Sequence, residues 1–201
     1  MNFTSPFTRP PVNLADLIAG GEAYAQQRMQ RYGHLNPAFL FLAEDGRPGA
    51  MFFQNGEFNE AQKAWFAETC RFAAIATGAS ACCLVLEVWV SAMKLPADID
   101  PLTYRPDPMP SQDPLRHEII LLQGETREGT NSKALSIVRF DNRKFASLVP
   151  ADFFDTSKGW EIGGQFSHVL TGVVKGSVKH IVILYPVWSF RFGAAARLSP
   201  A

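Results

Sequence analysis

Residues 81–92 read ACCLVLEVWVSA, a run that is apolar at nearly every position. Such a run predicts a central β-strand with both faces covered. The adjacent Cys82 and Cys83 then point to opposite faces of the sheet, so they cannot easily hold one metal ion together. We expect these two thiols and Cys70 to be buried and unreactive.

The segments on either side of this strand predict two hairpins. Each has two short apolar runs joined by a turn rich in turn-forming residues. The expected strands are residues 38–43, 50–54, 117–124 and 133–141, with turns at 44–49 and 125–132. Because hairpin strands are antiparallel, the pattern predicts a mainly antiparallel sheet built from two hairpins and a central strand.

Two long helices are expected to pack on this sheet. The first begins after the capping residue Asn13 and runs to about Arg31. The second begins at a capping box of Asn59 and Gln62 and runs to about Thr77. The predicted fold class is therefore α+β.

Three aromatic residues of the second helix lie at helical spacing: Trp65, Phe66 and Phe72. This spacing is typical of a core-facing stripe, and we expect core residues rather than a platform for stacking nucleotide bases.

The 201 residues indicate one domain. Prolines at the start predict an extended arm over residues 1–12, and the core unit covers 35–141. Residues 150–201 are glycine-rich and basic and are expected to form a variable extension of the same domain. Within it, residues 180–186 (HIVILYP) predict a late strand, and the tail from 193 a short helix or frayed end.

Composition narrows the class of protein. The apolar fraction is 47% and the charged fraction 19%, which is typical of a folded chain. The formal net charge is zero, so we expect no nucleic-acid partner. No apolar run approaches the roughly 20 residues of a membrane helix. The start has no signal-peptide pattern, and the odd cysteine count does not fit a disulfide framework, so we expect a cytoplasmic protein.

The candidate site lies where the central strand meets residues 93–115, which hold six prolines. Glu87 stands in an apolar run, where an unpaired carboxylate is costly to bury. It is either a general base at the mouth of a cleft, with Trp89 as the wall, or a structural partner of Arg116 or Arg139.

Arg116 and Glu118 share one face of the next strand, with His117 on the other. Arg116 is a candidate clamp for a carboxylate or phosphate, because its planar fork suits such groups. The alternative is that Arg116 anchors the proline-rich loop to Glu87 or Asp113.

Three segments together resemble a group of uncharacterised bacterial single-domain proteins. They are Glu87-Val88-Trp89, the segment PSQDPLRHE at 110–118, and Gly124-Glu125. The group shares an E-x-W strand end, a P-S-x-x-P-x-R-x-E segment and a G-E turn. The resemblance covers roughly residues 35–141 and implies an organisation but no chemistry.

The candidate catalytic residues are therefore Glu87, Arg116 and Glu118, and the ligand-binding candidates are Trp89, Arg116 and Glu125. The four histidines are widely spaced and no nucleophile elbow or phosphate loop is present, so no metal or cofactor is expected.

The main hypothesis is a non-enzymatic binding or accessory protein, with a small ligand or protein partner near residues 93–115 and a homodimer as one arrangement. One alternative is a small hydrolase or transferase that uses Glu87, Arg116 and Glu118. Another is a component of a phage-like or multi-protein assembly.

Overall fold

The computed structural model describes residues 7, 9–53, 60–90, 112–153, 169–170 and 185–186. Several expectations fall outside these residues. They concern most of the arm at 1–12, the cap at Asn59, the loop at 91–111, the first part of the late strand and the tail from 193.

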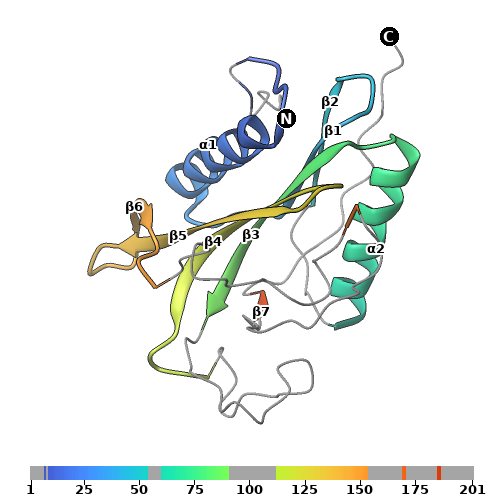
Figure 1. Cartoon of the computed structure of the whole chain (residues 1–201). Helices are drawn as coiled ribbons and strands as arrows, with labels where there is room; N and C mark the ends of the chain where they lie inside the picture. Colours follow the sequence, from blue (N-terminus) through green and yellow to red (C-terminus); the bar gives the residue numbers. More distant parts are fainter. Residues whose placement is uncertain are drawn as a thin grey trace.

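The described chain forms one antiparallel sheet with two helices, which confirms the α+β prediction (Figure 1). The elements in chain order are α1 (Leu14–Tyr32), β1 (Ala38–Leu42), β2 (Pro48–Phe52), α2 (Glu60–Ala76), β3 (Ala81–Val90), β4 (His117–Thr126), β5 (Thr130–Arg139), β6 (Phe145–Pro150) and β7 (Tyr185–Pro186). The strand order is β2-β1-β3-β4-β5-β6, and β7 pairs with the last residues of β3. The predicted central strand is thus central.

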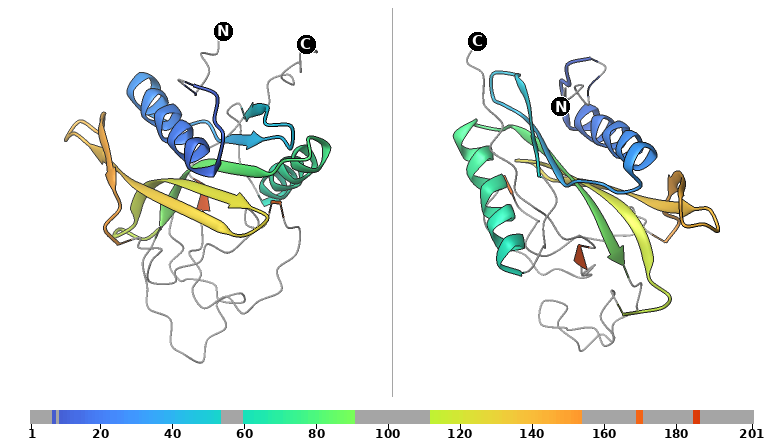
Figure 2. Two further views of the ribbon diagram at one scale, coloured as in Figure 1. Left: turned by 45° about the horizontal axis from the view of Figure 1, so that its top comes forward. Right: turned by 180° about the vertical axis from the view of Figure 1, so that it is seen from behind.

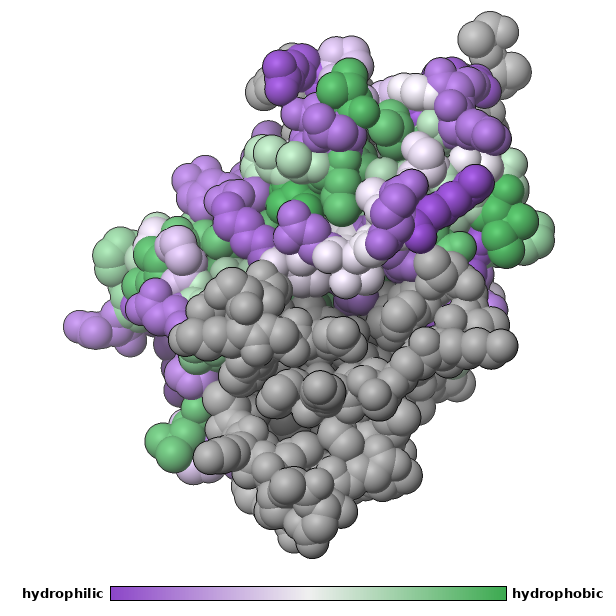
Figure 3. All heavy atoms as spheres, in the orientation of Figure 1, coloured by the Kyte–Doolittle hydropathy of each residue, from purple (hydrophilic) through white to green (hydrophobic). Residues whose placement is uncertain are grey.

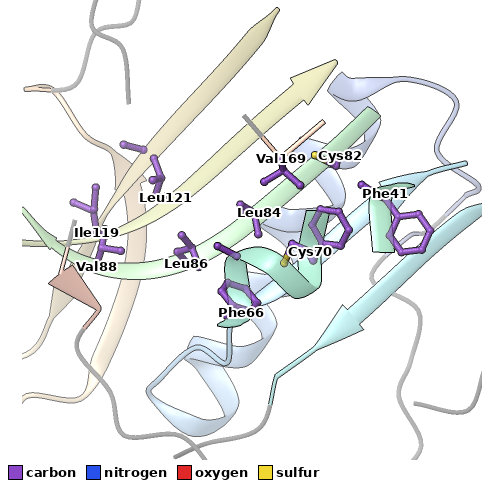
Figure 4. Packing of buried hydrophobic residues seen from close by; sticks show 14 of the residues in the cluster. Phe41, Phe66, Cys70, Cys82, Leu84, Leu86, Val88, Ile119, Leu121 and Val169 are labelled. Carbon is purple, nitrogen blue, oxygen red and sulfur yellow. The ribbon is translucent and has the colours of Figure 1, made fainter. Parts of the chain in front are cut away.

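The two helices cover opposite faces of the sheet (Figure 2). Because side chains alternate along β3, Cys82 faces α2 and Cys83 faces α1, as predicted. On the α2 side, Phe66 and Cys70 pack over Leu84 and its neighbours (Figure 4). All three cysteines are buried and free.

Helix α1 begins and ends as its residues predict. The Asn13 side chain accepts a hydrogen bond from the Asp16 amide, and Gly33 ends the helix with φ of 73°. Gly21 interrupts the apolar pattern for a packing reason. A Cβ there would lie 2.9 Å from Val85, so the glycine lets α1 approach the sheet closely.

Part of the aromatic stripe on α2 was wrongly assigned to the core. Phe66 is fully buried, but Trp65 is 52% exposed and Phe72 is 74% exposed. The side of α2 that bears Phe66 and Cys70 packs on the sheet, whereas Trp65 and Phe72 lie on the opposite side of the helix.

The second hairpin is tighter than predicted, and it is followed by a strand that the pattern did not reveal. The expected turn over 125–132 is wrong, because the ladder continues to Glu125 opposite Thr130. The polar side chains of this segment favour a turn in the sequence. A strand is held by backbone hydrogen bonds, however, so polar residues can continue it. β6 was missed because its residues are only partly buried and lack clear alternation.

Candidate functional site

Four of the five candidate residues lie on the sheet face that carries α1. Trp89 and Glu118 are direct cross-strand partners, and Glu87 lies opposite Ile120. Arg116 precedes Glu118 by two residues and therefore continues the same face. The structure brings these four side chains to the end of β3 and the beginning of β4.

Glu87 is a buried carboxylate with structural partners. The residue is 5% exposed. Its Oε2 accepts a hydrogen bond of 2.8 Å from the Leu35 amide, and its Oε1 lies 3.6 Å from Nη2 of Arg139. Of the two arginines considered as partners, Arg139 forms the ion pair. Arg116 makes different contacts.

Arg139 joins three elements of the fold. Its Nε donates to Oε2 of Glu118 over 2.7 Å, and its Nη1 donates to the carbonyl of Gly33 at the end of α1 over 3.4 Å. The guanidinium therefore contacts two carboxylates and a helix C-terminus, where partial negative charge favours a cation. This Glu87–Arg139–Glu118 cluster fixes α1 against β3, β4 and β5.

Arg116 lies over the Trp89 indole instead of in an ion pair. Its guanidinium carbon is 4.5 Å from the centre of the Trp89 ring. Its Nη1 donates to the Asp113 carbonyl over 3.1 Å, and its backbone amide donates to the same oxygen. Of the two contacts considered from the sequence, Arg116 makes the one with Asp113, through the backbone carbonyl and not the carboxylate; residues 93–111 lie outside the described chain. Among the described residues, no carboxylate lies within ion-pair distance of Arg116.

Trp89 also has an unused hydrogen-bond donor. Its Nε1 is covered by protein and has no acceptor among the described residues. A buried donor without a partner costs about 1–3 kcal/mol. At the end of β3, two groups therefore have N–H donors without an acceptor among the described residues. They are the indole N–H of Trp89 and the guanidinium of Arg116.

Glu125 belongs to a different part of the molecule. It pairs with Cys82, so it lies on the α2 face, seven residues along β3 from the level of Trp89. That separation is about 23 Å at the usual rise of a strand. Glu125 is 2% exposed, and its carboxylate accepts hydrogen bonds from the amides of Val169 and Leu170, over 2.7 and 3.1 Å. Its contacts hold a distant backbone segment on the sheet.

The remaining titratable groups do not add to the site. His117 points to the opposite face, where its ring lies 4.4 Å from that of Phe153. Partial burial and nearby Arg28 lower the pKa of His34. Burial raises the pKa of Cys83 to about 12, which disfavours the thiolate. Within the described ranges, no three potential metal ligands come together.

No family model, no curated protein and no solved structure matches this chain. The longest described helices are also too short or too polar to cross a membrane.

Proposed function

We propose that this chain is a binding protein, and that Trp89 and Arg116 receive an oxyanion, a carboxylate or a phosphate, of its ligand. The observation that carries the proposal is the stacked guanidinium of Arg116, which has no carboxylate partner among the described residues. A planar guanidinium held on an aromatic ring is preorganised to donate two parallel hydrogen bonds to such a group.

The contrast with Arg139 supports this assignment. Both arginines lie on the same face, yet Arg139 is neutralised by Glu87 and Glu118. Arg116 is left with one backbone oxygen and an indole face. An anionic ligand would balance this charge, with the Trp89 ring holding the guanidinium in place.

The surroundings of Arg116 favour a site that a ligand can reach. Arg116 and Trp89 are partly exposed, and Leu115 beside them is 80% exposed. Trp89 lies at the end of β3 and Arg116 directly before β4, so the two residues flank the proline-rich stretch 93–115 in the chain.

The hydrolase or transferase alternative finds less support in the geometry. A general base must reach the proton that it removes. The Glu87 side chain is 3% exposed, and its two oxygens contact Arg139 and the Leu35 amide. These contacts stabilise the ionised form and leave Glu87 a structural group, so we place Glu118 and Glu87 outside the binding function.

Titration with inorganic phosphate and with succinate, followed by nuclear magnetic resonance, tests the proposal. We expect the Trp89 indole N–H and the Arg116 side chain to shift saturably, with dissociation constants in the millimolar range. Arg116→Gln should weaken binding at least tenfold, and Arg116→Lys should recover only part of it because lysine lacks the planar fork.

Arg47→Gln is the matched control, since Arg47 forms an exposed ion pair with Asp45 in another hairpin. It should leave both titrations unchanged. Equal weakening by Arg116→Gln and Arg47→Gln, or no saturable shift at Trp89 with either anion, would refute the anion site.

We further propose a cytoplasmic location and membership of the uncharacterised bacterial group named above. The three free, buried cysteines support a reducing compartment. The motifs around Glu87, Arg116 and Glu125 support the group. The assembly hypothesis is favoured by a separate observation, the exposed apolar side of α2.

A further inference from the structure

The outward side of α2 is unusually apolar for a helix that faces solvent. Three of its large side chains are exposed: Trp65 at 52%, Phe72 at 74% and Ile75 at 78%. Glu68, between Trp65 and Phe72, is also exposed, as are Ala64 and Ala76 at the two ends. The opposite side of the helix, with Phe66 and Cys70, is already buried in the core.

A helix that is hydrophobic on both sides is normally covered on both sides. Residues 65, 68, 72 and 75 recur at the spacing of one helical face, so the exposed side chains form a continuous stripe rather than scattered positions. We call Trp65, Phe72 and Ile75 the α2 stripe. Helix α2 lies on the side of the sheet away from α1 (Figure 2), and hydrophobic residues, drawn in green, are visible on the right-hand side of the surface in Figure 3.

We propose that the α2 stripe is the interface of a homodimer, in which α2 of one copy packs antiparallel on α2 of a second copy about a two-fold axis. A two-fold interface must be self-complementary, so that residue i meets residue j and residue j meets residue i. The pattern of charge and size along α2 meets this requirement.

The charges near the stripe are self-complementary. Glu68 and Arg71 form an ion pair of 2.5 Å, in which the Glu68 side chain is 71% exposed and the Arg71 side chain 24% exposed. The midpoint of this pair falls between residues 69 and 70. The midpoint of the stripe, between Trp65 and Ile75, falls at residue 70. One axis therefore serves both sets of residues.

An antiparallel arrangement about that axis brings the two ends of the stripe together and pairs opposite charges, with the two Phe72 side chains on either side of the axis. Trp65 of one copy would lie against Ile75 of the partner subunit, and Glu68 beside Arg71 of the partner subunit. Ala64 of one copy would be level with Ala76 of the partner subunit, and two small residues facing each other let the helices approach closely at both ends. A parallel arrangement would instead place like charges at the same level.

The first measurement is the mass of the full chain by sedimentation velocity. We expect a dimer at about 100 µM, roughly a hundredfold above a micromolar dissociation constant. Phe72→Glu should shift the chain to monomer. Phe140→Glu is the matched control, because Phe140 is 62% exposed but lies beyond β5 and outside the stripe. It should leave the dimer intact.

The charge pattern offers a second test that a merely destabilised chain would fail. Glu68→Arg alone and Arg71→Glu alone each place like charges across the axis, so each should weaken the dimer at least tenfold. Mixing the two variants restores both opposite-charge pairs, because one copy then carries two arginines and the other two glutamates. We expect heterodimers in the mixture.

Circular dichroism of each variant checks that the fold is retained. A parent chain that is monomeric at about 100 µM would overturn the proposal, since even weak specific interfaces associate there. A dimer that survives Phe72→Glu, or a mixture of charge variants with no heterodimer, would overturn the placement of its interface on α2. These outcomes do not depend on the anion site at Arg116.

Discussion

Replacing Arg139 with leucine removes the cation from the Glu87–Arg139–Glu118 cluster and leaves the packing of its aliphatic part largely in place. Glu87 then keeps the hydrogen bond from the Leu35 amide but has lost its ion pair. Glu118 is less affected, because its side chain is 33% exposed and water can solvate it.

The size of the loss follows from the burial of Glu87. Two unit charges 3.6 Å apart attract each other by about 5 kcal/mol at an effective dielectric constant of roughly 20. Removing one partner of a buried pair costs about 3–5 kcal/mol. The Arg139 side chain is 23% exposed, so we expect the lower end, about 3 kcal/mol in the free energy of unfolding.

Urea denaturation followed by circular dichroism measures this loss, with an unchanged denaturant slope as the sign of an unchanged native fold. The double variant Arg139→Leu with Glu87→Gln should recover most of the loss, since it also removes the buried negative charge that Arg139 balances.

Lys133→Leu is the matched control. Lys133 forms an ion pair with Glu22 in which the side chains are 43% and 40% exposed. Its removal should change stability by less than about 1 kcal/mol. The reasoning fails if Arg139→Leu costs no more than this control, or if the double variant is no more stable than the single one.

Three further predictions concern other parts of the fold. Glu125→Ala should remove two hydrogen bonds to a charged group and lower stability by about 3 kcal/mol. Hydrogen exchange at the Val169 amide should become faster. Unchanged protection of that amide would contradict the role of Glu125 in holding this segment. Gly124→Ala places a Cβ 2.8 Å from a backbone oxygen and should lower the free energy of unfolding by about 1–3 kcal/mol in a urea melt. In the control Gly129→Ala the new Cβ meets nothing within 4 Å, so stability should not change. Equal losses in the two variants would argue against a close contact at Gly124. The pKa of His34 is lowered in the folded chain, so protonation favours the unfolded state, and stability should fall as the pH drops from about 6.5 towards that lower pKa. His34→Gln should reduce this dependence of stability on pH. An unchanged dependence would mean that other groups cause it.

Much of the fold follows from local pattern. The apolar run at 81–92 predicts a central strand because only a strand covered on both faces has apolar residues at consecutive positions. The same alternation separates Cys82 from Cys83. Asn13 and Gly33 mark the ends of α1 because capping depends on residues next to each other in the chain.

The side of α2 that meets the sheet could not be read in the same way. Trp65 and Phe72 are as apolar as Phe66, and helical spacing alone does not say which stripe is buried. That choice depends on how α2 crosses the sheet, so it belongs to tertiary packing. The outcome is the exposed stripe on which the dimer proposal rests.

By itself, the sequence determined the class of the fold, the central strand and the short list of polar residues at its end, since these depend on neighbouring residues and on periodicity. The tertiary structure decided what those residues do. Glu87 could pair with Arg116 or with Arg139, and only the register of β3, β4 and β5 places Arg139 beside it and leaves Arg116 on Trp89. The physical reason is that an ion pair depends on distance in space, whereas the sequence specifies separation along the chain.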